Sequence, residues 1–333
     1  MMKLGIRSDF LNTDQVQINQ SLRSRISLPE LFSLLFLLGL VFVFSYHHHL
    51  GYYQPWDFQQ SYLPAGGGDY SNYFYGYWIM PVFWLLKQLP FTLAFLIWSI
   101  LNLLGAFFAA RVFGGKTWLA IFSYQMMYVI FYGQITGLIV GGLALAWWGM
   151  ANKKLHWAGL GFLICAIKPQ LGLPLSMIIW TQYDLMWKER FKILLVPAAG
   201  LLMTFILYPD WIQNILLAVQ SGKVDTMGNI SIWRFIGPWS LVFFLFPMII
   251  KVSRHDRIML LIVAVVFATP YLQQTGLLIL LVLPFGWLGI LGNLGFLFPF
   301  FMWDLVGWLF LIPLSIYVLM CIELLIQKKS SPV

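Results

Sequence analysis

The chain has 333 residues, of which 60% are hydrophobic and only 10% are charged, and its formal net charge at pH 7 is +8. An ordinary soluble domain carries about 25% charged residues, and no soluble fold hides this much apolar surface, so the composition excludes a soluble protein and indicates a polytopic membrane protein. The positive charge alone would suit nucleic-acid binding, but the positions of the basic residues, described below, exclude that partner.

Candidate membrane-spanning helices follow a polar N-terminal stretch. A spanning helix needs roughly 17–25 largely apolar residues, and the first such run, Leu31 to Tyr46, is expected to act as a signal anchor and not as a cleaved signal peptide. We predict ten to twelve spans in a single integral membrane domain, 30–326, with a cytoplasmic N-terminal segment, 1–29, and a cytoplasmic tail, 327–333. The candidate spans are 30–50, 91–110, 117–132, 135–151, 155–168, 169–187, 192–208, 231–250, 258–270, 272–290 and a final hairpin within 294–326.

The basic residues indicate the orientation, because cytoplasmic loops carry an excess of Lys and Arg. With both termini in the cytoplasm, every basic residue falls on the cytoplasmic side except Lys87, Lys168, Lys223 and Arg234. This arrangement requires that residues 76–90 do not cross the membrane, so we expect a juxtamembrane or re-entrant helix there. The net charge therefore reflects topology in a multi-pass cell-membrane protein and does not indicate nucleic-acid binding.

The same orientation places unusual polar residues from five connections on the extracytoplasmic face. An outward-facing active site explains this clustering at least as well as the loops of a transporter do. The segments are the first loop with Asp57 and Asp69, "YGQIT" (132–136), "IKPQ" (167–170), "GNISIWR" (228–234) and "TPYLQQT" (269–275).

Three of these segments carry a resemblance to a known family. "WDFQQSYLPA…YFYGYWIMP" after the first span, "FYGQITGLIVGGLALA" and "WAGLGFLICAIKPQLGLPL" resemble, in order and spacing, segments of glycosyltransferase family 87, in the GT-C superfamily. The likeness covers roughly residues 30–290. It implies an all-α polytopic bundle of about ten to twelve transmembrane helices, whose outer first loop carries juxtamembrane helices.

The resemblance also implies a function. Such an enzyme transfers a hexose, typically mannose, from a polyprenyl-phosphate-sugar donor to a glycolipid or glycan acceptor at the extracytoplasmic face. An Asp at the start of the first outer loop is the usual catalytic base, and Asp57 matches that position. The chain departs from the pattern in its late outer loop, where relatives often carry a His and this chain has Tyr271-Leu272-Gln273-Gln274.

Asp57 suits a general base, which must lie within hydrogen-bond reach of the proton that it removes. Direct displacement with one carboxylate predicts inversion of the anomeric centre. The alternative interpretation is a helix cap, because Gln60 follows three residues later as in a capping box.

Two outer cations are candidate ligands for the donor phosphate. Lys168 lies between apolar stretches, and charges within the membrane are costly and usually functional; the alternative is that it reaches the outer interface. Arg234 has the planar fork that suits bidentate phosphate contact, and membrane anchoring is its alternative.

Further candidate substrate-binding residues are polar residues of the same loops. Asp69 follows three glycines, and a solvated turn explains it as well as acceptor binding does. The neighbouring tyrosines at 70, 73, 75 and 77 are mostly expected at the membrane interface, where Tyr and Trp gather. Gln134 begins a Gly133/Gly137/Gly141 spacing that allows close helix packing. The remaining candidates are Gln170, Tyr271, Gln273 and Gln274.

No cofactor or metal is expected. His47, His48 and His49 would point about 100° apart on a helix and so cannot share one ion, and no metal-binding or nucleotide-binding motif accompanies them. Cys165 and Cys321 lie inside apolar runs and predict no disulfide framework.

Two other functions stay open, and no protein partner is indicated. A transporter or lipid flippase would also place polar loops on one face, although neither an inverted repeat nor a matched pair of broken helices is visible. A catalytically inactive relative that binds lipid-linked sugar is compatible with the departure in the late loop.

Overall fold

The computed structural model describes residues 20–22, 24–51, 53–220, 228–285, 293 and 303–330. This part of the chain is helical, with no strand beyond an isolated bridge between Asn229 and Gln273, which confirms the all-α class. Lys3, Arg7, Arg23, Lys223 and the first limb of the hairpin within 294–326 lie outside the described residues. The helices are α2 (Leu28–His49), η1 (Phe58–Tyr62), α3 (Leu63–Gly66), η2 (Tyr77–Ile79), α4 (Met80–Lys87), α5 (Phe91–Phe113), α6 (Thr117–Ile121), α7 (Tyr124–Tyr132), α8 (Thr136–Ala151), α9 (Leu155–Ala166), α10 (Pro169–Gln182), α11 (Trp187–Leu207), α12 (Trp211–Gln220), α13 (Trp233–Ile236), η3 (Gly237–Leu241), α14 (Val242–Ile249), α15 (Arg254–Ala268), η4 (Gln274–Leu277), α16 (Leu278–Val282), η6 (Trp303–Phe310) and α19 (Leu311–Ser330).

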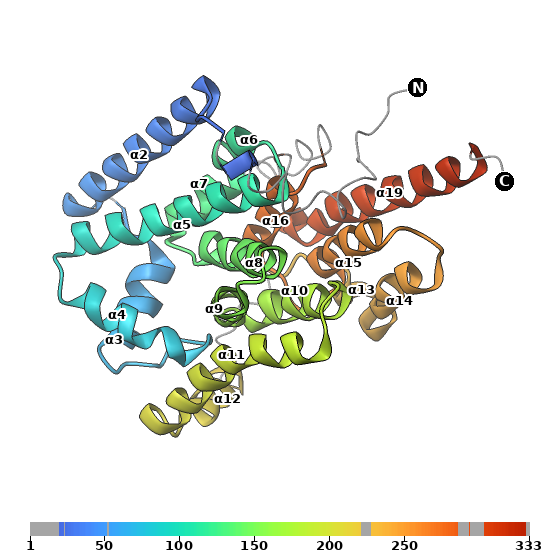
Figure 1. Cartoon of the computed structure of the whole chain (residues 1–333). Coiled ribbons are helices and arrows are strands. Elements are labelled where there is room, and N and C mark those ends of the chain that lie inside the picture. Colours follow the sequence, from blue (N-terminus) through green and yellow to red (C-terminus); the bar gives the residue numbers. More distant parts are fainter. Residues whose placement is uncertain are drawn as a thin grey trace.

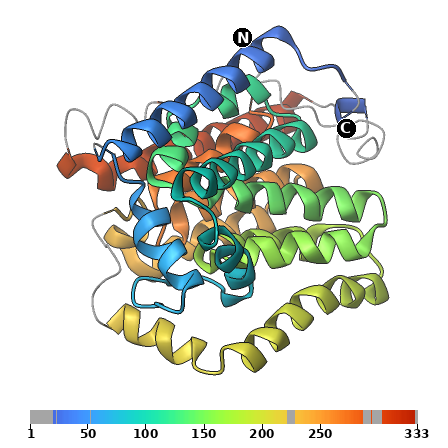
Figure 2. The same ribbon diagram turned by 90° about the vertical axis from the view of Figure 1, so that its left-hand side faces the viewer.

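The helices form a row with a second group packed against it. Helices α2, α5, α8, α9 and α11 contact one another in that order, from the top to the bottom of Figure 1. Helix α10 contacts α8, α9 and α15, and α15 contacts α14 and α19, so these helices build the second group. The short helices of the first loop, α3 and α4, lie at one side of the row, at the left of Figure 1. This side faces the viewer in Figure 2.

Four described helices are long and apolar enough to span a membrane: α2, α5, α11 and the helix over Gly307–Ile326. Helices α7 and α8 add a fifth span if the pair, bent by 117°, is counted as one. The chain is therefore a polytopic membrane protein, with four or five candidate spans among the described residues where the sequence predicts ten to twelve over the whole chain. Several apolar runs that the sequence predicts as single spanning helices are divided into shorter helices in the structure.

The breaks have local causes. Ser123 caps α7 by accepting a hydrogen bond from the Met126 N–H, which splits the expected span 117–132. The expected span 231–250 is split at Gly237, whose φ of +55° no L-residue adopts readily. The segment 76–90 contains α4, whose eight residues rise about 12 Å. That is less than half of the hydrocarbon core, which confirms that this segment does not span. At the C-terminus, α19 extends to Ser330, into the expected tail.

Glycines let α5 and α8 pack backbone to backbone. A Cβ on Gly141 would lie 2.7 Å from the Gly105 Cα, and a Cβ on Gly137 would lie 2.3 Å from the Asn102 carbonyl oxygen. Such distances leave no room for any side chain, which is how small residues bring membrane helices together. The packing role expected for Gly137 and Gly141 is confirmed.

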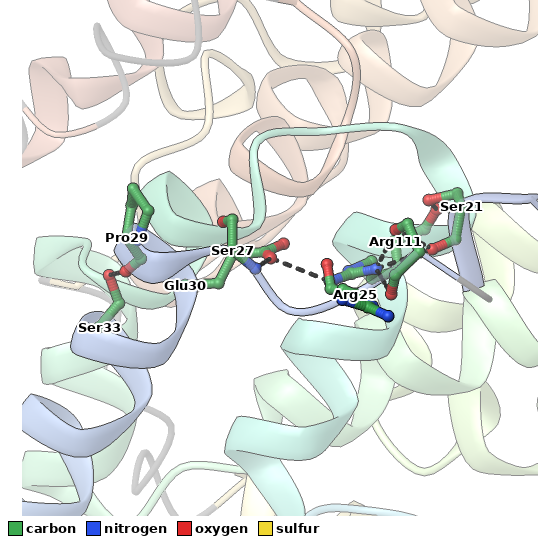
Figure 3. A network of polar contacts seen from close by, with 8 residues as sticks. Ser21, Arg25, Ser27, Pro29, Glu30, Ser33 and Arg111 are labelled. Atoms are coloured by element: carbon green, nitrogen blue, oxygen red, sulfur yellow. Dashed lines mark hydrogen bonds and ion pairs between the residues drawn. The ribbon is translucent and has the colours of Figure 1, made fainter.

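A buried ion pair fixes the start of α2 to the end of α5 (Figure 3). The Arg111 guanidinium donates to the Glu30 carboxylate (2.9 Å) and to the backbone carbonyls of Ser21 (2.8 Å) and Ser24 (3.0 Å). Glu30 also accepts from the Ser27 N–H (2.7 Å), the N-cap of α2. Arg111 is 6% exposed and Glu30 9%, so each needs the other as a partner.

Replacing Gly141 by Ala is expected to destabilise the protein by about 1–3 kcal/mol, because the new methyl group meets the α5 backbone, which cannot move aside as a side chain does. The measurement is the thermal unfolding midpoint of the purified full chain in detergent. Gly39→Ala is the matched control, because a Cβ on Gly39 meets nothing within 4 Å. Equal midpoints for the two variants would contradict the packing argument.

Replacing Arg111 by Met is expected to cost about 3 kcal/mol or more, because it leaves the Glu30 carboxylate buried and unpaired. The exposed pair Lys153–Glu189, in which the Lys153 side chain is 60% exposed, supplies the control. Lys153→Met should cost less than about 1 kcal/mol. The same thermal measurement decides, and a larger loss in the Lys153 variant would overturn the prediction.

Candidate active site

Aromatic packing fixes Asp57 in the first loop. Asp57 directly precedes η1, and the next residue, Phe58, is fully buried. The Phe58 ring stacks on Trp98 of α5, with centroids 5.9 Å apart, and also packs against Phe91 and Phe95. This contact holds the loop against α5 and leaves the Asp57 side chain half-buried.

The break between α7 and α8 brings Gln134 to Asp57. Gly133 has a φ of +67°, and a Cβ there would lie 2.5 Å from the Cβ of Phe58. Both the backbone conformation and the lack of space therefore require glycine at this position. The Trp98 indole N–H donates to the Gly133 carbonyl (2.8 Å), which ties the break to α5. Gln134 follows, 3% exposed, and its Nε2 donates to Asp57 Oδ2.

Lys168 lies at the junction of α9 and α10 and is 2% exposed. Its ammonium donates to Gln134 Oε1 (3.3 Å) and to Gln273 Oε1 (3.0 Å), and it lies 5.9 Å from the centre of the Tyr75 ring. The first loop is tied to this junction, because the Gly76 N–H donates to the Ile167 carbonyl (2.8 Å). A charge this deeply buried is tolerated only with hydrogen-bond partners.

Asn229 positions the late loop that carries Gln273. Its Oδ1 accepts from the Leu272 N–H (3.0 Å), and its Nδ2 donates to the Pro270 carbonyl (3.0 Å). The Ile230 N–H donates to the Leu272 carbonyl (2.8 Å), so the two segments run side by side. This pairing places Gln273 against Lys168.

The result is one hydrogen-bonded chain, Asp57–Gln134–Lys168–Gln273, built from four separate connections. Asp57 and Lys168 are not a salt bridge, because neither oxygen of the Asp57 carboxylate lies within 4.0 Å of the ammonium. Both are held instead by the neutral amide of Gln134. The site thus keeps a carboxylate and an ammonium close together without letting them neutralise each other.

The site sets the acidity of Asp57. Burial raises the pKa of this carboxyl to about 6, while the Lys168 charge and the hydrogen bond from Gln134 act in the opposite direction. A carboxylate with such a pKa is ionised at neutral pH and is a stronger base than an exposed Asp. Tyr62 and Tyr75 face it, and burial raises the pKa of both hydroxyls far above neutrality, so they stay uncharged.

Two helices, α8 and α10, begin next to Gln134 and Lys168. Lys168 is the N-cap of α10, and Gln134 lies two residues before the first residue of α8. Helix N-termini carry partial positive charge and free N–H groups, which favour a bound anion. The ammonium of Lys168 adds its charge to the N-terminus of α10, so this side of the site is electropositive.

The remaining candidate residues lie around the hydrogen-bonded chain and are not members of it. Gln170 follows Lys168 in the first turn of α10, Tyr271 lies close enough to Tyr75 to interact with it electrostatically, and Gln274 is buried with its amide near the Tyr128 hydroxyl. Arg234 is exposed and donates to the Asn229 carbonyl (3.1 Å), in the segment that pairs with the late loop.

Asp57 and Asp69 have different surroundings. Asp69 is exposed, and its Oδ1 accepts from the Ser71 N–H (3.1 Å), the contact of a solvated turn residue. Asp57, by contrast, makes no capping hydrogen bond to the helix that it precedes. The capping interpretation of Asp57 is therefore wrong.

The expectation that the loop tyrosines lie at the membrane interface is wrong for most of them. Tyr73, Tyr75 and Tyr77 are buried, and they pack with Tyr62 and other rings under the loop. Only the surrounding structure decides this, because a Tyr suits both environments. Sequence reasoning consequently missed that Tyr75 lies beside Lys168. The only signal in the sequence was its position within the Tyr-rich stretch.

Sequence reasoning also missed Asn229 and a pair of threonines. Thr136 and Thr275, both buried, share a hydrogen bond of 3.1 Å beside the site. Among the three histidines, the His48 ring stacks on Phe91 with centroids 3.7 Å apart. Within the described ranges, no group of three His, Cys, Asp or Glu residues could hold a metal ion.

Comparison with known proteins adds the family. A family model described as glycosyltransferase family 87 matches residues 73–288, well over half of the chain. Gln134, Lys168 and Gln273 lie within the match, and Asp57 lies before it. No curated protein and no solved structure matches the chain. The chain belongs to glycosyltransferase family 87 and is a membrane glycosyltransferase.

Proposed function

We propose that this glycosyltransferase takes a hexose, mannose in the first instance, from a polyprenyl-phosphate donor and transfers it to a glycolipid or glycan at the extracytoplasmic face of the cell membrane. The observation that carries the proposal is the pairing, within one buried hydrogen-bonded chain, of a carboxylate base and an uncompensated ammonium. Transfer from a phosphate-linked sugar needs both groups: one for the acceptor hydroxyl and one for the leaving phosphate.

The reaction uses the two groups in one step. An acceptor hydroxyl attacks the anomeric carbon, and its proton passes to the Asp57 carboxylate. The bond between the anomeric carbon and the phosphate oxygen breaks, and its electron pair stays on that oxygen. With one carboxylate and direct displacement, the anomeric configuration inverts.

Lys168 would stabilise the phosphate as it gains charge. An ammonium has three N–H donors, and Gln134 and Gln273 account for two of them. The third donor is left for the phosphate, and Lys168 is itself the N-cap of α10, a position that favours an anion. Arg234, tied to Asn229, would reach the donor from the side of the late loop.

A carrier lipid suits this protein physically. Helix α11 exposes most of its apolar side chains, as expected for a surface that faces lipid. A donor held in the membrane by a polyprenyl chain needs no nucleotide site, and the base and the cation then act where the lipid phosphate and a water-side hydroxyl meet. We propose the cytoplasmic position of both termini from the positive-inside rule alone.

The test is sugar transfer by purified protein in liposomes, supplied with radiolabelled polyprenyl-phosphate mannose and native lipid extract. Replacing Asp57 by Asn should lower the transfer rate by about 100-fold or more, the usual contribution of a general base. The matched control is Asp184→Asn, since Asp184 is an exposed acid whose side chain is 87% accessible.

Each outcome assigns a function. Equal transfer by wild type and Asp57→Asn would remove Asp57 as the base but keep the enzyme. No transfer by folded wild type with either mannose or glucose donors would contradict the proposal. That result would favour a flippase or an inactive lipid-linked-sugar binder.

The pH dependence supplies a separate prediction. Because the base must be deprotonated, kcat/KM should rise as the pH increases through about 6, where the Asp57 carboxyl ionises, and should level off above it. The measurement is the initial transfer rate at low donor concentration between about pH 5 and about pH 8. A flat profile over that range would contradict an Asp57 base.

A further inference from the structure

Gln134 is held at both ends of its amide. Its Nε2 donates to the Asp57 carboxylate, and its Oε1 accepts from the Lys168 ammonium at 3.3 Å. A carboxylate can only accept and an ammonium can only donate, so the chemistry of the two partners fixes the orientation of the amide. Both ends of the amide are thus occupied, and the residue is only 3% exposed.

The neighbours of Gln134 each keep unused capacity. Within the described ranges, Asp57 Oδ1 makes no hydrogen bond, and the Lys168 ammonium donates to Gln134 and Gln273 only. A direct ion pair would use up the base and the cation together. The amide between them prevents this, while the two charges remain close enough to feel each other.

We propose that Gln134 is a positioning residue that holds the Asp57 carboxylate and the Lys168 ammonium at opposite ends of its amide, and so makes proton binding at Asp57 and anion binding at Lys168 depend on each other. The inference rests on the proposed function in one respect, the placement of a phosphodiester at Lys168. The coupling is reciprocal by thermodynamic necessity.

The sign of the coupling follows from the charges. The titratable groups that face Asp57 are Lys168, Tyr62 and Tyr75, and both tyrosines stay neutral. An anion at Lys168 offsets the positive charge that favours the Asp57 carboxylate, so Asp57 binds its proton more tightly in the complex. Conversely, protonation of Asp57 removes a negative charge from the neighbourhood of the anion, which then binds more tightly.

Dibutyl phosphate is a suitable probe, because it is a soluble phosphodiester with one charge throughout the range and no transferable sugar. Calorimetry on the purified full chain in nanodiscs gives its dissociation constant at each pH. For wild type, affinity should increase as the pH falls through about 6, and the midpoint reports proton binding by Asp57. In Asp57→Asn the increase in affinity centred on about pH 6 should be absent.

Gln134→Met tests the positioning role directly. Met has a similar length but donates no hydrogen bond to the carboxylate, so the midpoint should move up by about one pH unit or more. Gln134→Glu, nearly isosteric, places a second carboxylate there and should also move it up, which keeps the test decisive if the Met variant does not fold. The acid limb of kcat/KM should move by the same amount.

Gln125→Met is the matched control. Gln125 is a glutamine in the first turn of α7, 1% exposed, whereas Gln134 follows the other end of that helix. Its loss should leave the midpoint unchanged, whatever it does to stability.

Three results would overturn the inference. They are an unchanged midpoint in the Gln134 variants, a midpoint shifted to lower pH, as a direct ion pair would give, and the absence of dibutyl phosphate binding by folded wild type. If wild type transfers no sugar but the midpoint moves as expected, the coupling stands and only the proposed reaction fails.

Discussion

A buried ammonium is the constraint on which the site depends. Lys168 is almost without solvent contact, and no carboxylate within the described residues pairs with it directly. Leaving such a charge unsatisfied costs several kcal/mol, so the fold must deliver acceptors to it from elsewhere in the chain. Gln134 and Gln273 are those acceptors, and they come from positions 34 and 105 residues away.

The rest of the fold makes this delivery possible. Backbone contact between α5 and α8 brings the start of α8 to α5, and Gly133 lets the chain turn tightly against Phe58 and so brings Gln134 to Asp57. The aromatic cluster holds the first loop on α5, and Asn229 holds the late loop in register with its neighbour. Each of these contacts is structural, yet each determines the position of one polar side chain of the site.

Arg111 and Lys168, the buried Arg and Lys of the described residues, are held differently. Arg111 pairs directly with Glu30 and with backbone carbonyls, a rigid arrangement that fixes α2 to α5 (Figure 3). Lys168 is kept apart from Asp57 by an amide and retains a free donor. A direct pair satisfies both charges and serves stability, whereas a spaced pair leaves both groups available for chemistry.

Several features of this protein follow from the sequence alone. Hydrophobicity predicts the ends of α2 and α5 to within three residues, because a helix in lipid must be long and apolar. Lys168 stands out because a charge among apolar residues is expensive and needs an explanation, and Asp57 stands out as an acid at the start of the first outer loop. The three family segments lie in one order along the chain, and the family match confirms the family.

Only the tertiary structure decided the rest. Whether a Tyr faces lipid headgroups or a core depends on what packs over it, and the sequence around Tyr73 and Tyr75 does not encode that. The breaks in the expected spans depend on caps and turns that a hydropathy window averages away. Gln134 could be noticed but not understood, because its role is set by two partners distant in sequence. Contacts between distant segments form only when the helices pack, and for that reason the sequence determined the class, the family and the two charges, and the fold determined how they act together.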